Sequence, residues 1–267
     1  MRTNKFEHMR PAEIVAAREQ KSIVYLAVAP LEWHGLHLPF GTDPLDAYGF
    51  ACRLAEKTGG VIMPPLFCGT ERERSPEVVA SFGFDDPDLY VVGMDIPANI
   101  VPSMYFREDI FGLIVREHLR LLVKLQYKLI VLINGHGAEN QKATCHRLAV
   151  EFSNETSSKV MDVFGFLSFD EVGEDPGHAN KYETSLQMSL FPENVDFSVY
   201  PPRNIPLKYK DYSVADDKMF WCKPSKDFTV ENDPRDATAE IGKRCMNIAV
   251  DKYSVLIEEQ YKTLRDK

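Results

Sequence analysis

The chain has 267 residues, of which 44% are hydrophobic and 27% charged, and its formal net charge is −9. This length and composition are ordinary for one α/β domain with a large buried core, so we expect a single domain over residues 1–267. The negative charge argues against a nucleic-acid partner and against an anionic membrane surface, because both attract basic proteins. No apolar run reaches the roughly 18 residues that a membrane-spanning helix needs.

The cysteines and the N-terminus indicate where the protein works. Cysteine occurs an odd number of times, without a CxxC pair, which suggests free thiols in a reducing compartment. The first ten residues have no apolar core of the kind that a signal peptide contains. We therefore expect a cytoplasmic protein, in which most of the cysteines are packing residues: Cys52, Cys68, Cys145, Cys222 and Cys245.

The first predicted elements are a helix over residues 11–20, with Pro11 in its first turn, and a strand over residues 23–29. The strand is a short apolar run rich in β-forming residues, and Pro30 closes it. Such a run is typical of a strand that is buried on both faces.

The stretch that follows, residues 31–43, carries Glu32, His34, His37 and Asp43 between glycines and a proline. Glu32 and His34 are two residues apart, so an extended backbone would point both side chains to one side. The turn-forming residues can then fold Asp43 back toward that pair. Carboxylate, imidazole and carboxylate at a strand end form a ligand set for zinc, manganese or iron. The alternative is a polar loop whose histidines are solvated or act as caps.

A helix is predicted after this stretch, because residues 44–57 are apolar at helical spacing and end at Gly59. Asp46 lies in the first turn of this helix. It could bind a metal, but a carboxylate in a first turn is better explained by the helix dipole.

A short strand is expected over residues 61–66, followed by a charged loop that contains Arg72 and Arg74. In a parallel α/β sheet, sites form at the carboxyl ends of strands, so this loop should overlook the same cavity. Both arginines are therefore candidates for substrate binding, and a solvated charge run is the alternative. Residues 78–106 look irregular and offer either pocket walls or an oligomer contact.

The middle of the chain repeats the pattern of a strand followed by polar residues. An amphipathic helix is predicted over 107–126, a strand over 129–133 and another helix over 141–152. His136 follows the strand between two glycines. A lone histidine in a glycine turn is usually a turn residue, but two such clusters at equivalent strand ends favour one shared cavity with residues 31–43.

The last third contains a strand over 160–166, then His178 in a glycine-preceded loop, and a helix over 183–190. His178 is free to approach the strand ends, which suits a general acid or base; a hydrogen-bonded loop histidine is the alternative. Residues 192–234 are rich in loops, and the final helix is expected from residue 233 to the C-terminus.

Three motifs occur in one order: Glu32-x-His34-Gly-x-His37-Leu-Pro-x-Gly-Thr-Asp43, then Asn134-Gly-His136-Gly, and then His178 followed five residues later by Glu183-Thr-Ser185. Their order and internal spacing resemble those of the creatininase (creatinine amidohydrolase) family. The resemblance implies a three-layer α/β/α sandwich with a mostly parallel central sheet. It also implies a small-molecule substrate and a homo-oligomer, often a hexamer.

The resemblance further implies two divalent metal ions per subunit, with Zn²⁺ as the first choice and Mn²⁺ or Fe²⁺ as alternatives. It assigns Asp43 as the bridging ligand, Glu32 and His136 to one ion, and His34 to the other. Two such ions that share a carboxylate and a water can generate hydroxide near neutral pH and polarise a carbonyl. His178 matches the acid/base histidine that would give a proton to the leaving atom after hydroxide attack.

One ligand departs from the family pattern. Family members complete the second metal with a glutamate, which in creatininase stands two residues after the motif histidine, where this chain has Ala138. Glu139 and Glu183 are the two possible replacements. We favour Glu183, because the use of Glu139 would need a change of register on a tight turn.

The substrate does not transfer from the family. The creatininase pocket uses tryptophans that this chain does not match, since it has only Trp33 and Trp221. Trp33 also stands where family members commonly have glutamine. We therefore predict a hydrolase that opens a small cyclic amide or related ring. The alternatives are hydrolytic C–C opening of a keto-inositol, as in 3-dehydro-scyllo-inosose hydrolase, and a non-catalytic metal-binding scaffold. The substrate-binding candidates are Trp33, His37, Arg72 and Tyr182.

Overall fold

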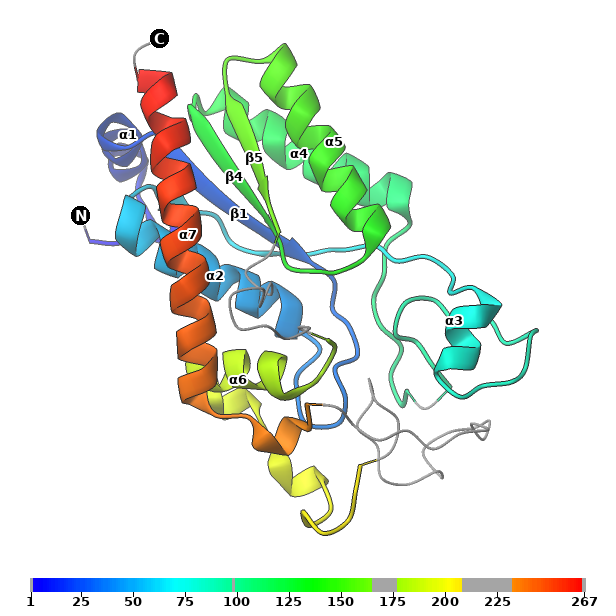
Figure 1. Ribbon diagram of the computed structural model, residues 1–267. Coiled ribbons are helices and arrows are strands. Elements are labelled where there is room, and N and C mark those ends of the chain that lie inside the picture. Colours follow the sequence, from blue (N-terminus) through cyan, green and yellow to red (C-terminus); the bar gives the residue numbers. More distant parts are fainter. Residues whose placement is uncertain (1, 98, 165–176, 208–231, 266–267) are drawn as a thin grey trace.

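A computed structural model describes residues 2–97, 99–164, 177–207 and 232–265 (Figure 1). Trp221, Cys222 and the end of the strand expected at 160–166 lie outside these residues, as does most of the loop-rich part of 192–234.

In the described part of the chain, the central sheet has five strands, and every pairing between them is parallel. Strand β1 (Ile23–Ala29) lies in the interior and pairs along its length with β4 (Leu129–Asn134), which pairs in turn with β5 (Lys159–Val163). The other edge of β1 carries β2 (Val61–Ile62) and β3 (Leu66–Phe67). Parallel pairing brings the carboxyl ends of β1, β3 and β4 to one edge of the sheet.

Helices cover both faces of the sheet, so the predicted three-layer α/β/α sandwich is confirmed (Figure 1). All seven residues of β1 are buried, and those from Ile23 to Val28 alternate between two cores. Tyr25 packs into the first core and Leu26 into the second. The first core is covered by α2 (Thr42–Thr58), α6 (Lys181–Leu190) and α7 (Ala239–Arg265), and the second by α1 (Pro11–Gln20), α4 (Glu108–Lys124) and α5 (Glu139–Glu155).

The larger differences from the sequence-based expectation concern three elements. The strand expected at 61–66 is split into β2 and β3, because Pro64 and Pro65 have no N–H to donate to a ladder. A short helix, α3 (Pro76–Ser81), begins just before the region expected to be irregular and extends into it. The last helix begins at Ala239 rather than at residue 233, because Asp233 caps a separate 3₁₀ turn.

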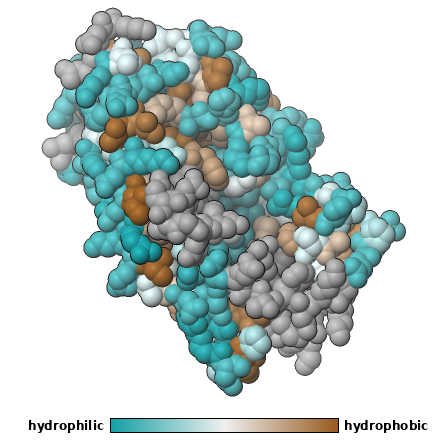
Figure 2. All heavy atoms as spheres, in the orientation of Figure 1, coloured by the Kyte–Doolittle hydropathy of each residue, from teal (hydrophilic) through white to brown (hydrophobic). Residues whose placement is uncertain are grey.

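No disulfide joins Cys52, Cys68, Cys145 or Cys245. No described helix is both long and apolar enough to cross a membrane. The face shown in Figure 2 is mostly hydrophilic, with hydrophobic patches between polar side chains, including some over the region of α3.

Candidate metal centre

The loop after β1 and the first turn of α2 place the side chains of Glu32, His34 and Asp43 below the surface. The ends of the loop are joined by a hydrogen bond of 2.9 Å from the backbone N–H of Glu32 to the carbonyl of Phe40. Helix α2 begins at Thr42, so Asp43 lies in its first turn. Glu32, His34 and Asp43 are 1%, 0% and 4% exposed. Buried charges of this kind are stable only when they are paired or bind a metal.

His34 faces the carboxylates with one defined ring nitrogen. Its Nδ1 donates to the backbone carbonyl of Glu32 at 3.0 Å, which leaves Nε2 with the lone pair in the neutral ring. Nε2 lies 3.0 Å from Oδ1 of Asp43 and 3.8 Å from Oε2 of Glu183. His34, Asp43 and Glu183 form one group whose ligand atoms lie within 4.8 Å of one another.

His136 faces the same aspartate from the end of β4. Its backbone N–H donates to Oδ1 of Asn134 at 3.0 Å, which holds the turn. A Cβ on Gly135 would lie 2.7 Å from the carbonyl oxygen of Asp43, so only glycine allows this turn to touch α2. Nδ1 of His136 is 2.9 Å from Oδ2 of Asp43 and 3.4 Å from Oε2 of Glu32. Glu32, Asp43 and His136 form a second group within 4.8 Å.

Asp43 belongs to both groups, with one carboxylate oxygen toward His34 and the other toward His136. A carboxylate between two imidazoles, each with a further carboxylate beside it, has the donor set of a two-ion site for zinc or manganese. The residues therefore fit the pair of divalent ions that the family resemblance implies.

The structure places the two glutamate alternatives very differently. Glu183 is 4% exposed, and the backbone N–H of Ala179 donates to its Oε2. The side chain of Asn180 caps α6 by accepting from the N–H groups of Tyr182 and Glu183, which fixes the first turn that carries this carboxylate. The side chain of Glu139 is 88% exposed and pairs with Lys142. Of the two, Glu183 is the one that lies with the other ligand candidates.

Opposing pKa shifts describe the electrostatics of this cluster. Burial raises the pKa of Glu183 to about 8. Burial alone would lower the pKa of His34, but the carboxylates of Asp43 and Glu183 outweigh it and raise that pKa to about 10. The pKa of His136 is raised well above its usual value, because Glu32 and Asp43 outweigh burial in the same way. The carboxylates thus create a strongly negative field in which protons and metal cations compete for the same lone pairs.

Asp46 lies one turn beyond Asp43 and is 1% exposed, which the helix dipole alone does not explain. Its Oδ1 accepts from Nε2 of Gln187 at 2.8 Å. Burial, followed by the nearby charges of Glu183 and Asp43, raises its pKa well above the usual value. Asp46 therefore favours the neutral acid, and it is in none of the ligand groups found among the described residues.

His178 forms a third such group with Glu32 and His34, and its tautomer is defined. Its Nε2 donates to the backbone carbonyl of Trp33 at 2.6 Å, because a carbonyl can only accept. Nδ1 is 3.9 Å from Oε2 of Glu32, and the ring centroid is 4.3 Å from that of His34. Burial, assisted by the charge of His34, lowers the pKa of His178 to about 4. At neutral pH the ring is neutral and its Nδ1 carries the lone pair.

A cavity of about 320 Å³ opens onto this cluster. Arg74, whose side chain is 30% exposed, lines it, whereas Arg72 is 67% exposed and bonds Glu108 outside it. Of the two arginine candidates, the structure therefore brings only Arg74 to the cavity. The other lining residues outside the ligand groups are Glu71, Met94, Gly137, Ala138, Glu139, Phe164 and Gly177.

The remaining substrate-binding candidates do not line this cavity. Trp33 packs its side chain into a small apolar cluster, and Tyr182 packs into the first core. Both ring nitrogens of His37 are hydrogen-bonded, to Thr184 at 2.7 Å and to Tyr200 at 2.6 Å. Burial lowers the pKa of His37 to about 3, so it is a neutral structural side chain here.

Two residues of the site were not predicted. Tyr105 donates its hydroxyl to Oε1 of Glu32, and burial raises the pKa of Tyr105, which keeps it a donor. No pattern in the surrounding irregular sequence indicates this contact. Glu71 lies in the charged loop after β3 that was expected to overlook the cavity, in which only Arg72 and Arg74 were predicted to bind substrate.

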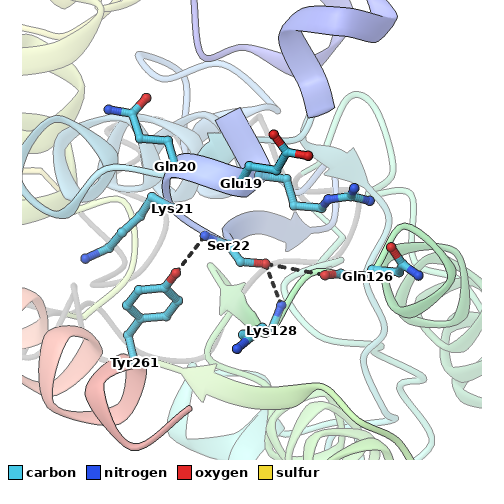
Figure 3. A pocket seen from close by; sticks show the side chains of 8 residues that line it. Glu19, Gln20, Lys21, Ser22, Gln126, Lys128 and Tyr261 are labelled. Carbon is cyan, nitrogen blue, oxygen red and sulfur yellow. Dashed lines mark hydrogen bonds between the residues drawn. The ribbon is translucent and has the colours of Figure 1, made fainter. Parts of the chain in front are cut away.

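A second hollow, of about 570 Å³, lies at the other end of the sheet, around the amino ends of β1 and β4 (Figure 3). Its polar groups bond one another. The N–H of Ser22 donates to the hydroxyl of Tyr261 at 2.9 Å, and the N–H of Lys128 donates to Oγ of Ser22 at 2.9 Å. This hollow contains none of the ligand groups found among the described residues.

Comparison with known proteins points to the same family as the sequence motifs. The family profile described as "Creatininase: Creatinine amidohydrolase" matches residues 7–257. A comparison with curated proteins found no match.

Solved structures share the fold. A structure described as "Creatininase Mn" has a TM-score of 0.67 and 18% identity, with 97% of this chain and 99% of that one covered. A mutant creatininase of the Zn-Zn type has a TM-score of 0.68 and 18% identity, with coverage of 98% and 99%. A putative creatinine amidohydrolase from Bacteroides fragilis has a TM-score of 0.66 and 22% identity, with coverage of 98% for both chains. With the family profile spanning nearly the whole sequence, this chain belongs to the creatininase family of hydrolases.

Proposed function

We propose that this protein is a dinuclear metal-dependent hydrolase that opens a small cyclic amide or a related ring. The observation that carries the proposal is the position of Asp43, whose two carboxylate oxygens face His34 and His136 at 3.0 and 2.9 Å. Glu183 would complete the His34 site, and Glu32 the His136 site. Two divalent ions, zinc or manganese by preference and iron as an alternative, would supply a Lewis acid and lower the pKa of a water.

His178 would move the proton. Its Nε2–H is held by the carbonyl of Trp33, so its Nδ1 is the atom that can take a proton from a water in the cavity. The lowered pKa of about 4 makes the resulting imidazolium a ready donor to the leaving nitrogen or carbon. One ring can therefore serve both halves of the hydrolysis.

Other residues would hold the reacting groups in place. Tyr105 fixes one oxygen of Glu32, which leaves the other toward His34 and His136. The N–H of Ala179 fixes Glu183 in the same manner. Met94 and Phe164 give the cavity apolar walls, which limit the access of bulk water.

The composition of the cavity supports a second substrate class, a cyclic polyol ketone such as a keto-inositol, cleaved at a C–C bond. Arg74 lines the cavity and offers hydrogen-bonding groups for hydroxyls. The Trp33 side chain, which would suit a flat heterocycle, packs elsewhere. The non-catalytic alternative is disfavoured by the placement of His178 against the same cluster.

The test combines elemental analysis with a hydrolysis screen over lactams, formamides and cyclic polyol ketones. We expect two equivalents of divalent metal and turnover of one class, lost on chelation and restored by added metal. A His146→Ala variant is the matched control, because that histidine is 67% exposed and pairs with Asp162 outside the cavity. A purified protein that binds no divalent metal would refute the proposal.

We also propose that the protein works as a homo-oligomer, with a hexamer as the expected form. Several large hydrophobic side chains of the segment 90–104 are exposed, which is typical of a contact surface. They are Tyr90 at 68%, Ile100 at 76%, Val101 at 53% and Met104 at 59%. Sedimentation at micromolar concentration tests this, and a monomer would contradict it.

A further inference from the structure

One buried nitrogen of the candidate metal centre has no hydrogen-bond partner among the described residues. It is Nε2 of His136, the ring atom opposite the one that faces Asp43 and Glu32. Oε1 of Glu71 lies 3.9 Å from it. A buried polar nitrogen without a partner is unfavourable, so this atom needs an explanation.

Glu71 itself is held firmly at this place. Its side chain is 6% exposed, and its Oε1 accepts from a terminal nitrogen of Arg74 at 3.2 Å. Nε of Arg74 donates to the carbonyl of Gly93 at 3.0 Å. A Cβ on Gly93 would lie 2.8 Å from Cγ of Glu71 and 2.6 Å from the hydroxyl of Tyr105. Two loops are thus packed around the Glu71 side chain at a point where only glycine fits.

We propose that Glu71 is a positioning residue: its carboxylate accepts the Nε2–H of His136 and so keeps the Nδ1 lone pair directed at the metal. A neutral imidazole has one proton, and placing it on Nε2 is what frees Nδ1 to act as a ligand. A carboxylate behind a metal-binding histidine also fixes the ring and makes the nitrogen a stronger ligand. The inference rests on the proposed metal site.

The distance is compatible with this role. A hydrogen bond from a ring N–H to a carboxylate is about 2.7–3.2 Å long, so the 3.9 Å separation closes with a shift of roughly 1 Å. Such contacts are often longer before the ligand is bound. The alternative role is purely structural, with Glu71 serving only to hold Arg74 and the loop.

The two roles are separated by Glu71→Gln, which keeps the size of the side chain and an acceptor for Arg74 but removes the charge. Chelator competition on the zinc-loaded protein should show an affinity about 10–100-fold lower for one of the two ions, with the other unchanged. Glu73→Gln is the matched control, because Glu73 lies two residues away and is exposed. ¹⁵N spectra of the histidines should show the altered Nε2–H of His136 in Glu71→Gln alone.

The outcomes are distinct. Two ions bound as in the wild type would overturn the role of Glu71 and leave the proposed function standing. A similar loss for both ions, accompanied by a lower melting temperature, would show the purely structural role instead. A wild-type protein that binds no zinc would overturn both proposals.

Discussion

The two ends of the parallel sheet carry hollows that differ in kind. At the carboxyl ends of β1 and β4, a cavity of about 320 Å³ meets carboxylates and imidazoles that are almost fully buried. At the amino ends, a hollow of about 570 Å³ is lined by polar groups that satisfy one another (Figure 3). The larger hollow has the less reactive lining.

The cations at the amino end show why. Nζ of Lys21 lies 2.6 Å from Glu258, and Nζ of Lys128 donates to the carbonyl of Leu264 at 3.0 Å. These charges are balanced locally and partly solvated. At the carboxyl end, several buried carboxylates lie among imidazoles, an arrangement that is stable only with extra positive charge. Buried negative charge that the protein does not neutralise, rather than the volume of a hollow, therefore distinguishes the candidate functional site from a structural hollow.

The largest effect on the difference between the two ends of the sheet is expected from replacing Asp43. Asp43→Ala should lose both metal ions and all detectable turnover, because one carboxylate serves both groups. His34→Ala should lose mainly one ion. Elemental analysis after desalting measures this, and Asp85→Ala, at an exposed aspartate, is the control. Two equivalents of metal retained by Asp43→Ala would remove the bridge.

Removal of His178 should have the next largest effect. His178→Ala should keep both ions and reduce turnover by roughly 10²–10⁴-fold, as expected for a positioned acid/base group. The loss should shrink for substrates with good leaving groups, since these need no proton. Steady-state kinetics on a leaving-group series measures the difference. Full activity on the poorest leaving group would exclude His178 from the mechanism.

A smaller effect is expected at Tyr105, which contacts a ligand but no metal position. Tyr105→Phe removes the hydroxyl that orients Glu32, so affinity for the metal beside His136 should fall about tenfold. Chelator competition measures the affinity. Tyr90→Phe is the control, because Tyr90 is 68% exposed. An unchanged affinity would show that Glu32 is held without Tyr105.

The smallest effect on the site should come from the amino end. Tyr261→Phe leaves the buried N–H of Ser22 without its acceptor, so the free energy of unfolding should fall by about 1–3 kcal/mol. Metal content and turnover should not change. Urea unfolding and elemental analysis test the two halves of this prediction. A loss of metal would mean that the two ends of the sheet are coupled.

Most of the fold could be predicted because its signals are local. The apolar runs that become β1 and β4 are bounded by proline and glycine, and the following helices have clear periodicity. The split of the strand at 61–66 depends on Pro64 and Pro65, which interrupt the pairing inside an otherwise apolar run. The late start of α7 depends on a side-chain cap at Asp233, which is set by local geometry that periodicity does not report.

The candidate site was predictable only where its residues lie in short motifs. Glu32, His34 and Asp43 share one loop, and the structure brings them together. The cavity walls come from residues that are far apart in the sequence. The sequence therefore could not show that Arg74 lines the cavity and Arg72 does not, although they are two residues apart. The same holds for Tyr105, which reaches Glu32 across 73 positions of sequence.

In the contact between His178 and Trp33, the backbone and the side chain of Trp33 have separate roles. The proton-carrying ring is held by the backbone carbonyl of residue 33, which every amino acid possesses. The indole of that residue instead packs against Val79, Val91 and Met94, in the segment that supplies a cavity wall. A change of side chain at position 33 can therefore alter the cavity wall while the hydrogen bond that orients His178 is kept. Selection for a new substrate can therefore act at position 33 without changing the orientation of His178.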